Sequence, residues 1–143
     1  YNSKYKLEPN DLVMVLSDVT REGRIIGNVG FIPSNGKTYL LNQRVGKIVF
    51  NEKYRQWLYV TFNSKTFKDY CLSCANSATV LNFNNKDLFK FKVVLPKDKA
   101  LEDFTENAKP IFNLISTLGE QNTKLREARD ILLPRLMSGE IEV

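Results

Sequence analysis

The stretch LEDFTENAKPIFNLISTLGEQNTKLREARDILL (residues 101–133) carries apolar residues with a seven-residue period. With Leu101 at heptad position a and Phe104 at position d, every d position is apolar over about five repeats. This pattern is typical of a coiled-coil helix, so we expect residues 98–143 to form a long helical spacer and dimerisation segment. The predicted helix-pairing interface comprises Phe104, Ile111, Ile115, Leu118, Asn122, Leu125 and Leu132.

Two prolines limit the expected helix. Proline lacks the backbone N–H, so Pro110 predicts a restart or a kink, and Pro134 predicts the end of the helix. The uninterrupted part, residues 110–133, would then span about 36 Å. Asn122 and Arg129 occupy a positions, where a polar residue sets the register and limits burial. A second copy of the chain could supply the partner helix, so we expect a homodimer.

Residues 1–97 read as a separate body with an α+β (mixed α/β) fold that is rich in short strands and also has short helices. The apolar segments 11–17, 39–41, 45–50, 80–83 and 89–95 predict strands. Glycines within 21–30 predict a strand pair broken by turns or bulges, and the segment PSNG (residues 33–36) predicts a turn. A helix is expected around residues 54–62, and Asn63 or Ser64 could cap a second helix.

The two cysteines lie on that second helix. Phe67, Tyr70, Cys71 and Cys74 follow a helical apolar spacing, which places both thiols on the core face. A zinc site would need further Cys or His ligands, and a redox pair would begin at a helix N-terminus. The chain contains no histidine. Buried structural cysteine is therefore the favoured interpretation.

Charge is distributed unevenly along the chain. Residues 1–97 carry 15 Lys/Arg and 7 Asp/Glu, a net charge of +8, whereas residues 98–143 have a net charge of −3. A basic body suggests a polyanionic partner and an acidic tail suggests a protein partner, although solubility alone could account for both. No apolar run is long enough to cross a bilayer, no secretory leader is recognisable, and few cysteines are present, so a cytoplasmic location is expected. Because the chain begins with Tyr1, we expect it to be a piece of a longer protein.

Motifs of several enzyme classes are missing. The sequence has no phosphate-binding glycine loop, no dinucleotide fingerprint, no nucleophile elbow, and no Pro-Pro step of the kind found in amino-methyltransferases. Without histidine, a Ser-His-Asp or Cys-His site is impossible. The carboxylates of the body form no tight cluster for a metal ion. We therefore expect a binding module that has no catalytic residues, metal or cofactor.

Several segments together resemble the specificity subunits of type I restriction-modification systems. They are DLVMVLS (11–17), IGNVGFIP (26–33), YLLNQRV (39–45), WLY (57–59), ANSATVLN (75–82) and FKVVLP (91–96). The most specific segment is the tail, NTKLREARDILLPRLMSGEI (122–141), which resembles the C-terminal end of these subunits. Each body motif is weak alone, but their order together with the tail covers nearly the whole chain.

The resemblance implies a function and a set of partners. Such subunits have two target-recognition domains, each followed by a long helix, and each domain reads one half of a split double-stranded DNA site. The helices pair, methyltransferase (modification) subunits dock and supply S-adenosylmethionine, and a restriction and translocase subunit joins them. By this resemblance the chain is one half, the C-terminal one, and its helix of about 36 Å would approximate one turn of B-DNA.

Base reading requires side chains that match the donors and acceptors of the groove, and neighbouring cations hold the phosphates. Three polar clusters of the body fit this requirement. The candidate DNA-binding residues are Thr20, Arg21 and Arg24, then Ser34, Asn35, Lys37, Asn42, Gln43, Arg44 and Lys47, and finally Asn76, Ser77 and Thr79.

These residues also have structural interpretations. Asn35 could serve only the turn, Gln43 could satisfy buried backbone groups, and Lys65, Lys68, Lys90 and Lys92 could form a solvated face. Two other functions remain open at the level of sequence. One is a coiled-coil scaffolding or oligomerisation protein, and the other is the recognition end of a fused restriction-methyltransferase.

Overall fold

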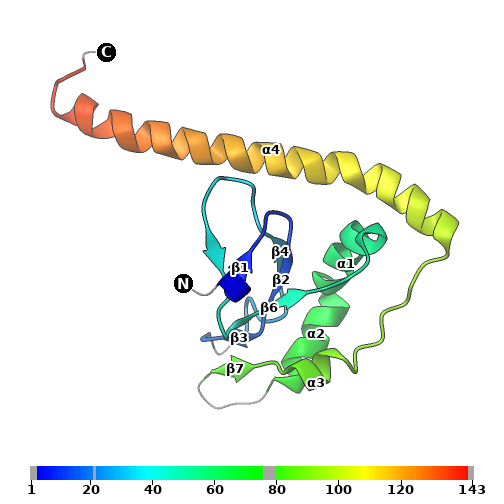
Figure 1. Cartoon of the computed structure of the whole chain (residues 1–143). Helices are drawn as coiled ribbons and strands as arrows, with labels where there is room; N and C mark the ends of the chain where they lie inside the picture. The colour runs from blue at the N-terminus through cyan, green and yellow to red at the C-terminus, as the bar shows by residue number, and fades with distance from the viewer. Residues whose placement is uncertain (1–2, 21, 76–79, 142–143) are drawn as a thin grey trace. The chain divides into compact units, whose positions relative to one another are not determined.

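The computed structural model describes residues 3–20, 22–75 and 80–141, and the chain divides into two compact units, residues 1–105 and 106–143. Figure 1 traces both units and shows the long C-terminal helix. The first unit extends beyond residue 97, the expected boundary, because the first turns of the helix pack on the body. There, the ring of Phe104 meets that of Trp57 edge to face at a centroid distance of 5.4 Å.

A three-stranded antiparallel sheet forms the centre of the first unit. Strand β2 (Leu12–Val15) lies between β4 (Val29–Phe31) and β6 (Val45–Ile48). Side chains alternate along β2, so that Leu12 and Met14 are buried while their neighbours are half-buried. Leu12 pairs with Phe31 and Ile48, and Val15 pairs with Val45, which fixes two distinct ends of the sheet.

Two smaller strand pairs form separate two-stranded sheets. Strand β1 (Lys6–Leu7) pairs with β5 (Tyr39–Leu40), and β3 (Ser17–Asp18) pairs with β7 (Leu81–Asn82), both antiparallel. Figure 1 shows β3 and β7 side by side. The strands expected in segments 11–17, 39–41, 45–50 and 80–83 are therefore confirmed, although each is shorter than its segment.

Short helices pack on the sheet and carry much of the core. After the 3₁₀ turns η1 (Ser3–Tyr5) and η2 (Glu52–Tyr54) come α1 (Arg55–Phe62), α2 (Lys65–Cys74) and α3 (Asn85–Leu88). Ser64 caps α2, because its hydroxyl accepts the N–H of Phe67 at 3.3 Å. Asn63 instead binds the backbone of β4: its side chain accepts the N–H of Val29 and donates to the carbonyl of Val29, each at 3.1 Å.

Both cysteines lie on the apolar stripe of α2, as predicted. Cys71 is fully buried beside Phe67, and Cys74 is half-buried. Burial raises the pKa of the Cys71 thiol to about 12, so it remains a neutral thiol at physiological pH. Within residues 3–20, 22–75 and 80–141, no group of His, Cys, Asp and Glu side chains could hold a metal ion.

Two strand predictions in the body were wrong. Within residues 89–95, burial alternates only from residue 90 to residue 94, with Phe91 and Val93 facing the core, and no described strand pairs with this segment. Just upstream lies α3, a short helix that we did not expect. Asn84 caps this helix, because its side chain accepts the N–H of Asp87 at 2.9 Å. The segment 21–30 contains only β4 among its described residues, and the rest is a loop.

The long helix α4 (Asp98–Met137) is continuous over 40 residues and includes both prolines. The prediction that Pro134 ends it was wrong, as was the restart at Pro110. Gly139, at a φ of +74°, ends the helix, and the N–H of Glu140 reaches back to the carbonyl of Arg135 at 3.0 Å. The full helix is about 60 Å long rather than 36 Å. Among the described residues, none of the helices combines the length and the apolar character needed to cross a bilayer.

Two glycines with nearly equal φ angles test how tightly the loop that follows β3 packs on α2. A Cβ on Gly27 (φ +76°) would lie 2.5 Å from Sγ of Cys71, whereas a Cβ on Gly36 (φ +73°) would meet open space. We expect Gly36→Ala to lower the free energy of unfolding by about 1–2 kcal/mol through backbone strain alone. Gly27→Ala should cost about 1–3 kcal/mol more because it also overpacks the core. Urea denaturation measures both, and equal losses would show that the contact with α2 is loose.

Candidate nucleic-acid interface

The loop between β3 and β4 begins at a buried carboxylate. Asp18 is only 1% exposed and accepts four hydrogen bonds from described residues. The N–H and hydroxyl of Thr20 bind Oδ1 at 2.8 and 2.7 Å, and the N–H groups of Ile25 and Ile26 bind Oδ2 at 2.7 and 3.2 Å. Burial raises the pKa of Asp18, but these hydrogen bonds outweigh it, so the pKa lies below its ordinary value and the buried group is ionised.

Arg24 lies on this loop with a hydrogen-bonded backbone and an exposed side chain. Its N–H donates to the hydroxyl of Thr20 at 3.2 Å, and its carbonyl accepts from Nζ of Lys68 at 2.8 Å. The guanidinium is 75% exposed and lies 3.5 Å from the exposed carboxylate of Glu22. This geometry presents a planar, five-donor group to solvent from a rigid support.

A second polar turn connects β5 to β6. The side chain of Asn42 accepts the N–H of Arg44 at 2.8 Å, which closes the turn locally. The carbonyl of Arg44 in turn accepts the N–H of Leu16 at 2.8 Å, which ties the turn to the chain beyond β2. Asn42, Gln43 and Arg44 are exposed. Exposure of Gln43 argues against the interpretation that it satisfies buried backbone.

The two loops flank the same end of β2. On one side Val15 exchanges backbone hydrogen bonds with Gly27 and Asn28, and on the other side Leu16 binds Arg44. We call this region the Val15 edge, comprising described residues 19, 20, 22–28 and 42–44. It brings together the predicted residues Thr20, Arg24, Asn42, Gln43 and Arg44 from two of the sequence clusters.

The rest of the second cluster lies elsewhere. The turn with Ser34, Asn35 and Lys37 follows β4, whose Phe31 pairs with Leu12, so it leaves the sheet at the opposite end. Asn35 binds within its own turn: its side chain accepts the N–H of Lys37 at 3.2 Å and donates to the hydroxyl of Tyr39 at 2.8 Å. Nζ of Lys47 forms an ion pair with Asp11 at 2.7 Å.

Four predicted residues, Arg21, Asn76, Ser77 and Thr79, lie outside the described residues. The third sequence cluster therefore lies wholly outside the described residues. The strand that follows it, β7, pairs with β3.

Two curated proteins are similar to the chain, and no family model matches it. One is the specificity subunit of the type I restriction enzyme HindI of Haemophilus influenzae, 29% identical over 118 residues, which cover 81% of this chain and 26% of that protein. The other is the specificity subunit of the type I restriction enzyme MjaVIII of Methanocaldococcus jannaschii, 26% identical over 148 residues, which cover all of this chain and 34% of that protein. The chain is related to type I restriction specificity subunits. It spans between a quarter and a third of the length of these two relatives.

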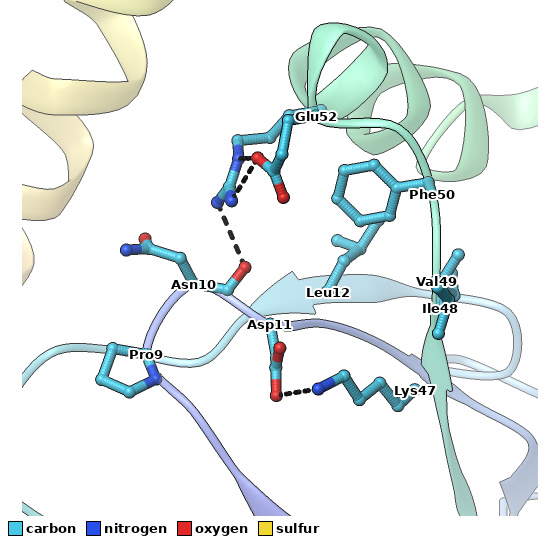
Figure 2. Close-up of a pocket in the computed structure, with 10 residues that line it drawn as sticks. Pro9, Asn10, Asp11, Leu12, Lys47, Ile48, Val49, Phe50 and Glu52 are labelled. Atoms are coloured by element: carbon cyan, nitrogen blue, oxygen red, sulfur yellow. Dashed lines mark hydrogen bonds and ion pairs between the residues drawn. The ribbon is translucent and has the colours of Figure 1, made fainter.

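The end of the sheet opposite the Val15 edge has a pocket of about 240 Å³. Its charged side chains are already paired. Figure 2 shows the pair of Lys47 and Asp11, and Arg55 pairs with Glu52 at 2.6 Å. Arg55 also donates to the carbonyl of Asn10 at 3.1 Å. The cations of these pairs are less exposed than Arg24, whose pair with Glu22 at the Val15 edge is also longer, so the pocket is less suited to an anion. The lining residues are Pro9, Asn10, Asp11, Leu12, Lys47, Ile48, Val49, Phe50, Glu52 and Arg55.

Sequence reasoning missed Asp18 and Lys68, the two charged residues that hold the Arg24 loop. The sequence offered a solvated face as one alternative for Lys68, but its Nζ binds the carbonyls of Arg24 and Ile26 and the side chain of Asn28. A signal for Asp18 existed, since an Asp two residues before a Thr commonly starts a side-chain-bonded turn. Nothing local in the sequence links Lys68 to a loop more than 40 residues away.

Replacing Asp18 tests the buried carboxylate. Because folding lowers its pKa, the charged form stabilises the protein above the unfolded pKa near 3.9, and this contribution is lost as pH falls through the lower folded value. Asp18→Asn should lower the free energy of unfolding at pH 7 by about 1–3 kcal/mol, since buried N–H groups lose a charged acceptor. The difference from wild type should shrink in acid.

The matched control is Asp69→Asn, which removes an exposed carboxylate that pairs with Lys65 on α2. It should change stability by no more than about 0.5 kcal/mol. Denaturant titrations at several pH values compare the three proteins. A difference between wild type and Asp18→Asn that is independent of pH would contradict the assignment of an ionised carboxylate.

Proposed function

We propose that the chain is the DNA-reading half of a type I restriction specificity subunit, a target-recognition domain followed by its spacer helix. It would recognise one half of a split double-stranded DNA target. The observation that carries this proposal is the Val15 edge, where Arg24, Gln43 and Arg44 are exposed on loops tied to one end of the sheet. The similarity to two specificity subunits supports it independently.

The side-chain chemistry of the Val15 edge suits base reading. Arginine pairs with guanine through two donors, and Asn or Gln pairs with adenine through a donor and an acceptor. Arg24, Gln43 and Arg44 would provide such contacts. Asn42 uses its side-chain oxygen within the turn, and Thr20 uses its hydroxyl on Asp18, so both serve mainly to shape the loops. Ser34, Asn35, Lys37 and Lys47 would at most contact phosphates.

The remaining assignments follow from the same proposal. The chain itself would be non-catalytic and need no cofactor, while methyltransferase subunits would bind S-adenosylmethionine and methylate the target. A restriction and translocase subunit would complete the assembly in the cytoplasm. The basic residues 1–97, with a net charge of +8, would face the DNA, and the acidic segment 98–143 would face protein partners.

The spacer helix would pair with the equivalent helix of the other half, or with that of a second copy. Its d positions Ile111, Leu118, Leu125 and Leu132 are between 46% and 66% exposed, an apolar stripe that a partner helix would cover. Phe104 differs from these because it contacts Trp57 within the first unit. At about 60 Å the helix exceeds one turn of B-DNA, so its length alone does not set the gap between half-sites.

The proposal predicts that Arg44→Ala changes which sequences bind. A random duplex pool selected with the wild-type chain supplies a preferred duplex, and a shuffled duplex is the comparison. Loss of a bidentate base contact should weaken binding to the preferred duplex by about 1–3 kcal/mol and leave the shuffled duplex nearly unaffected. Fluorescence anisotropy measures both affinities. The matched control is Lys37→Ala, which removes one positive charge from the other end of the sheet.

An equal loss on both duplexes would make Arg44 a phosphate contact, and no loss would remove it from the interface. Failure of the wild-type chain to enrich any sequence would defeat the proposed function itself.

Binding should also weaken steeply with salt, as expected if about 4–6 phosphates are neutralised. A salt slope near zero would show that the basic body does not hold DNA.

A further prediction concerns the apolar stripe of the helix. Leu118→Asp places a charge at the centre of the seam, so a dimeric chain should become monomeric. The control is Asn113→Asp, which adds the same charge at an exposed position outside the a and d positions. Light scattering at high micromolar concentration measures the mass of each. A monomeric wild-type chain would refute self-pairing but leave DNA reading untouched.

A further inference from the structure

Lys68 forms an unusual link between helix α2 and the loop that carries Arg24. Its Nζ donates to the carbonyl oxygens of Arg24 and Ile26, each at 2.8 Å, and to the side-chain oxygen of Asn28 at 3.2 Å. An ammonium group has three protons, so these three acceptors satisfy it fully. Burial lowers the pKa of Lys68, which fits an ammonium withdrawn from water into a loop.

Asp18, which carries the opposite charge to Lys68, binds the same loop. The carboxylate binds the N–H groups of Ile25 and Ile26, while Lys68 binds the carbonyls of Arg24 and Ile26. The peptide groups of residues 24–26 are thus held between a negative and a positive side chain. Ile26 is fully buried between these contacts. Charge-assisted hydrogen bonds of this kind are stronger and more directional than neutral ones.

Close packing adds a second restraint on the loop. Two glycines with positive φ, Gly23 at +59° and Gly27 at +76°, let the chain lie directly against α2. A Cβ at Gly23 would come within 2.5 Å of Leu72, and one at Gly27 within 2.5 Å of Cys71. The loop backbone therefore has little space in which to move relative to α2.

We propose that Lys68 is a positioning residue for DNA sequence recognition, because it fixes the backbone from which the Arg24 guanidinium reaches a base. This inference rests on the proposed DNA-reading function. Lys68 does not touch DNA in this proposal. It acts through Arg24, whose N–H and carbonyl are both held while its side chain stays 75% exposed. A bidentate contact depends on orientation far more than a phosphate contact does, so loosening the backbone should reduce selectivity more than affinity.

The test compares Lys68→Met with Lys65→Met in the full 143-residue chain. Both remove one positive charge from α2, but Lys65 is exposed and pairs only with Asp69 among the interactions of the described residues. The readout is the ratio of the dissociation constants for the shuffled and the preferred duplex. Lys68→Met should lower this ratio about tenfold, close to the effect of Arg24→Ala. Lys65→Met should change it less than about twofold.

A double variant separates positioning from a general loss of stability. In the Arg24→Ala background, Lys68→Met should change the ratio less than about twofold, because the contact that it positions is already gone. A purely structural role would instead lower the folded fraction and weaken both duplexes alike, leaving the ratio unchanged. Circular dichroism checks the fold, and if Lys68→Met does not fold, the shorter polar variant Lys68→Gln takes its place in both backgrounds with an expected partial loss.

The outcomes decide separately between the inference and the function on which it rests. A folded Lys68 variant that keeps the wild-type ratio overturns the inference and leaves DNA reading standing. The same holds if Arg24→Ala keeps the ratio, or if the Lys68 variant lowers it equally with and without Arg24. A wild-type ratio of one overturns both.

Discussion

The buried carboxylate of Asp18 is the constraint on which the rest of the first unit depends. A charge removed from water is tolerated only when hydrogen bonds replace its hydration, and here four donors from described residues do so. Three of them are backbone N–H groups of the loop that follows, so satisfying the charge also shapes the loop. Ile26 is buried in the core, and the chain then continues into β4, which pairs with β2.

The same constraint separates the framework from the surface that could recognise a ligand. Framework contacts at the Val15 edge fall on backbone groups: Leu16 binds Arg44, Val15 binds Gly27 and Asn28, and Asp18 binds residues 20, 25 and 26. The side chains of Arg24, Gln43 and Arg44 remain exposed. At the other end of the sheet Lys47 pairs with Asp11 at 2.7 Å, whereas at the Val15 edge the pair of Arg24 and Glu22 is longer, at 3.5 Å, and both of its side chains are exposed. The two ends therefore differ in what they can offer an anionic partner.

The periodic elements could be predicted from sequence, because a period reports burial directly. The stripe of α2 and the heptads of α4 were predicted from their periods, whereas β2 was predicted from an apolar run bounded by polar residues. Residues 90–94 also alternate between exposed and half-buried, but a strand also needs a partner, which no periodicity reveals. Pro134 lies within the helix, and Gly139 ends it, because a left-handed residue closes the last carbonyls. Residue type predicted Arg24 and Arg44 as candidates, but not Lys68, whose charge looked like any solvated one.

The way in which the Arg24 loop is held has a consequence for how recognition could change. Asp18 and Lys68 bind residues 24–26 through backbone N–H and carbonyl groups, which every residue type possesses except that proline lacks the N–H. Replacing Arg24 by another residue would leave these bonds, and therefore the position of its Cα, intact. Other positions of the loop are restricted: Gly23 and Gly27 by positive φ and by contact with α2, and Ile26 by burial in the core. The loop thus combines a backbone fixed by two buried charges with a recognition side chain whose identity the fold does not constrain.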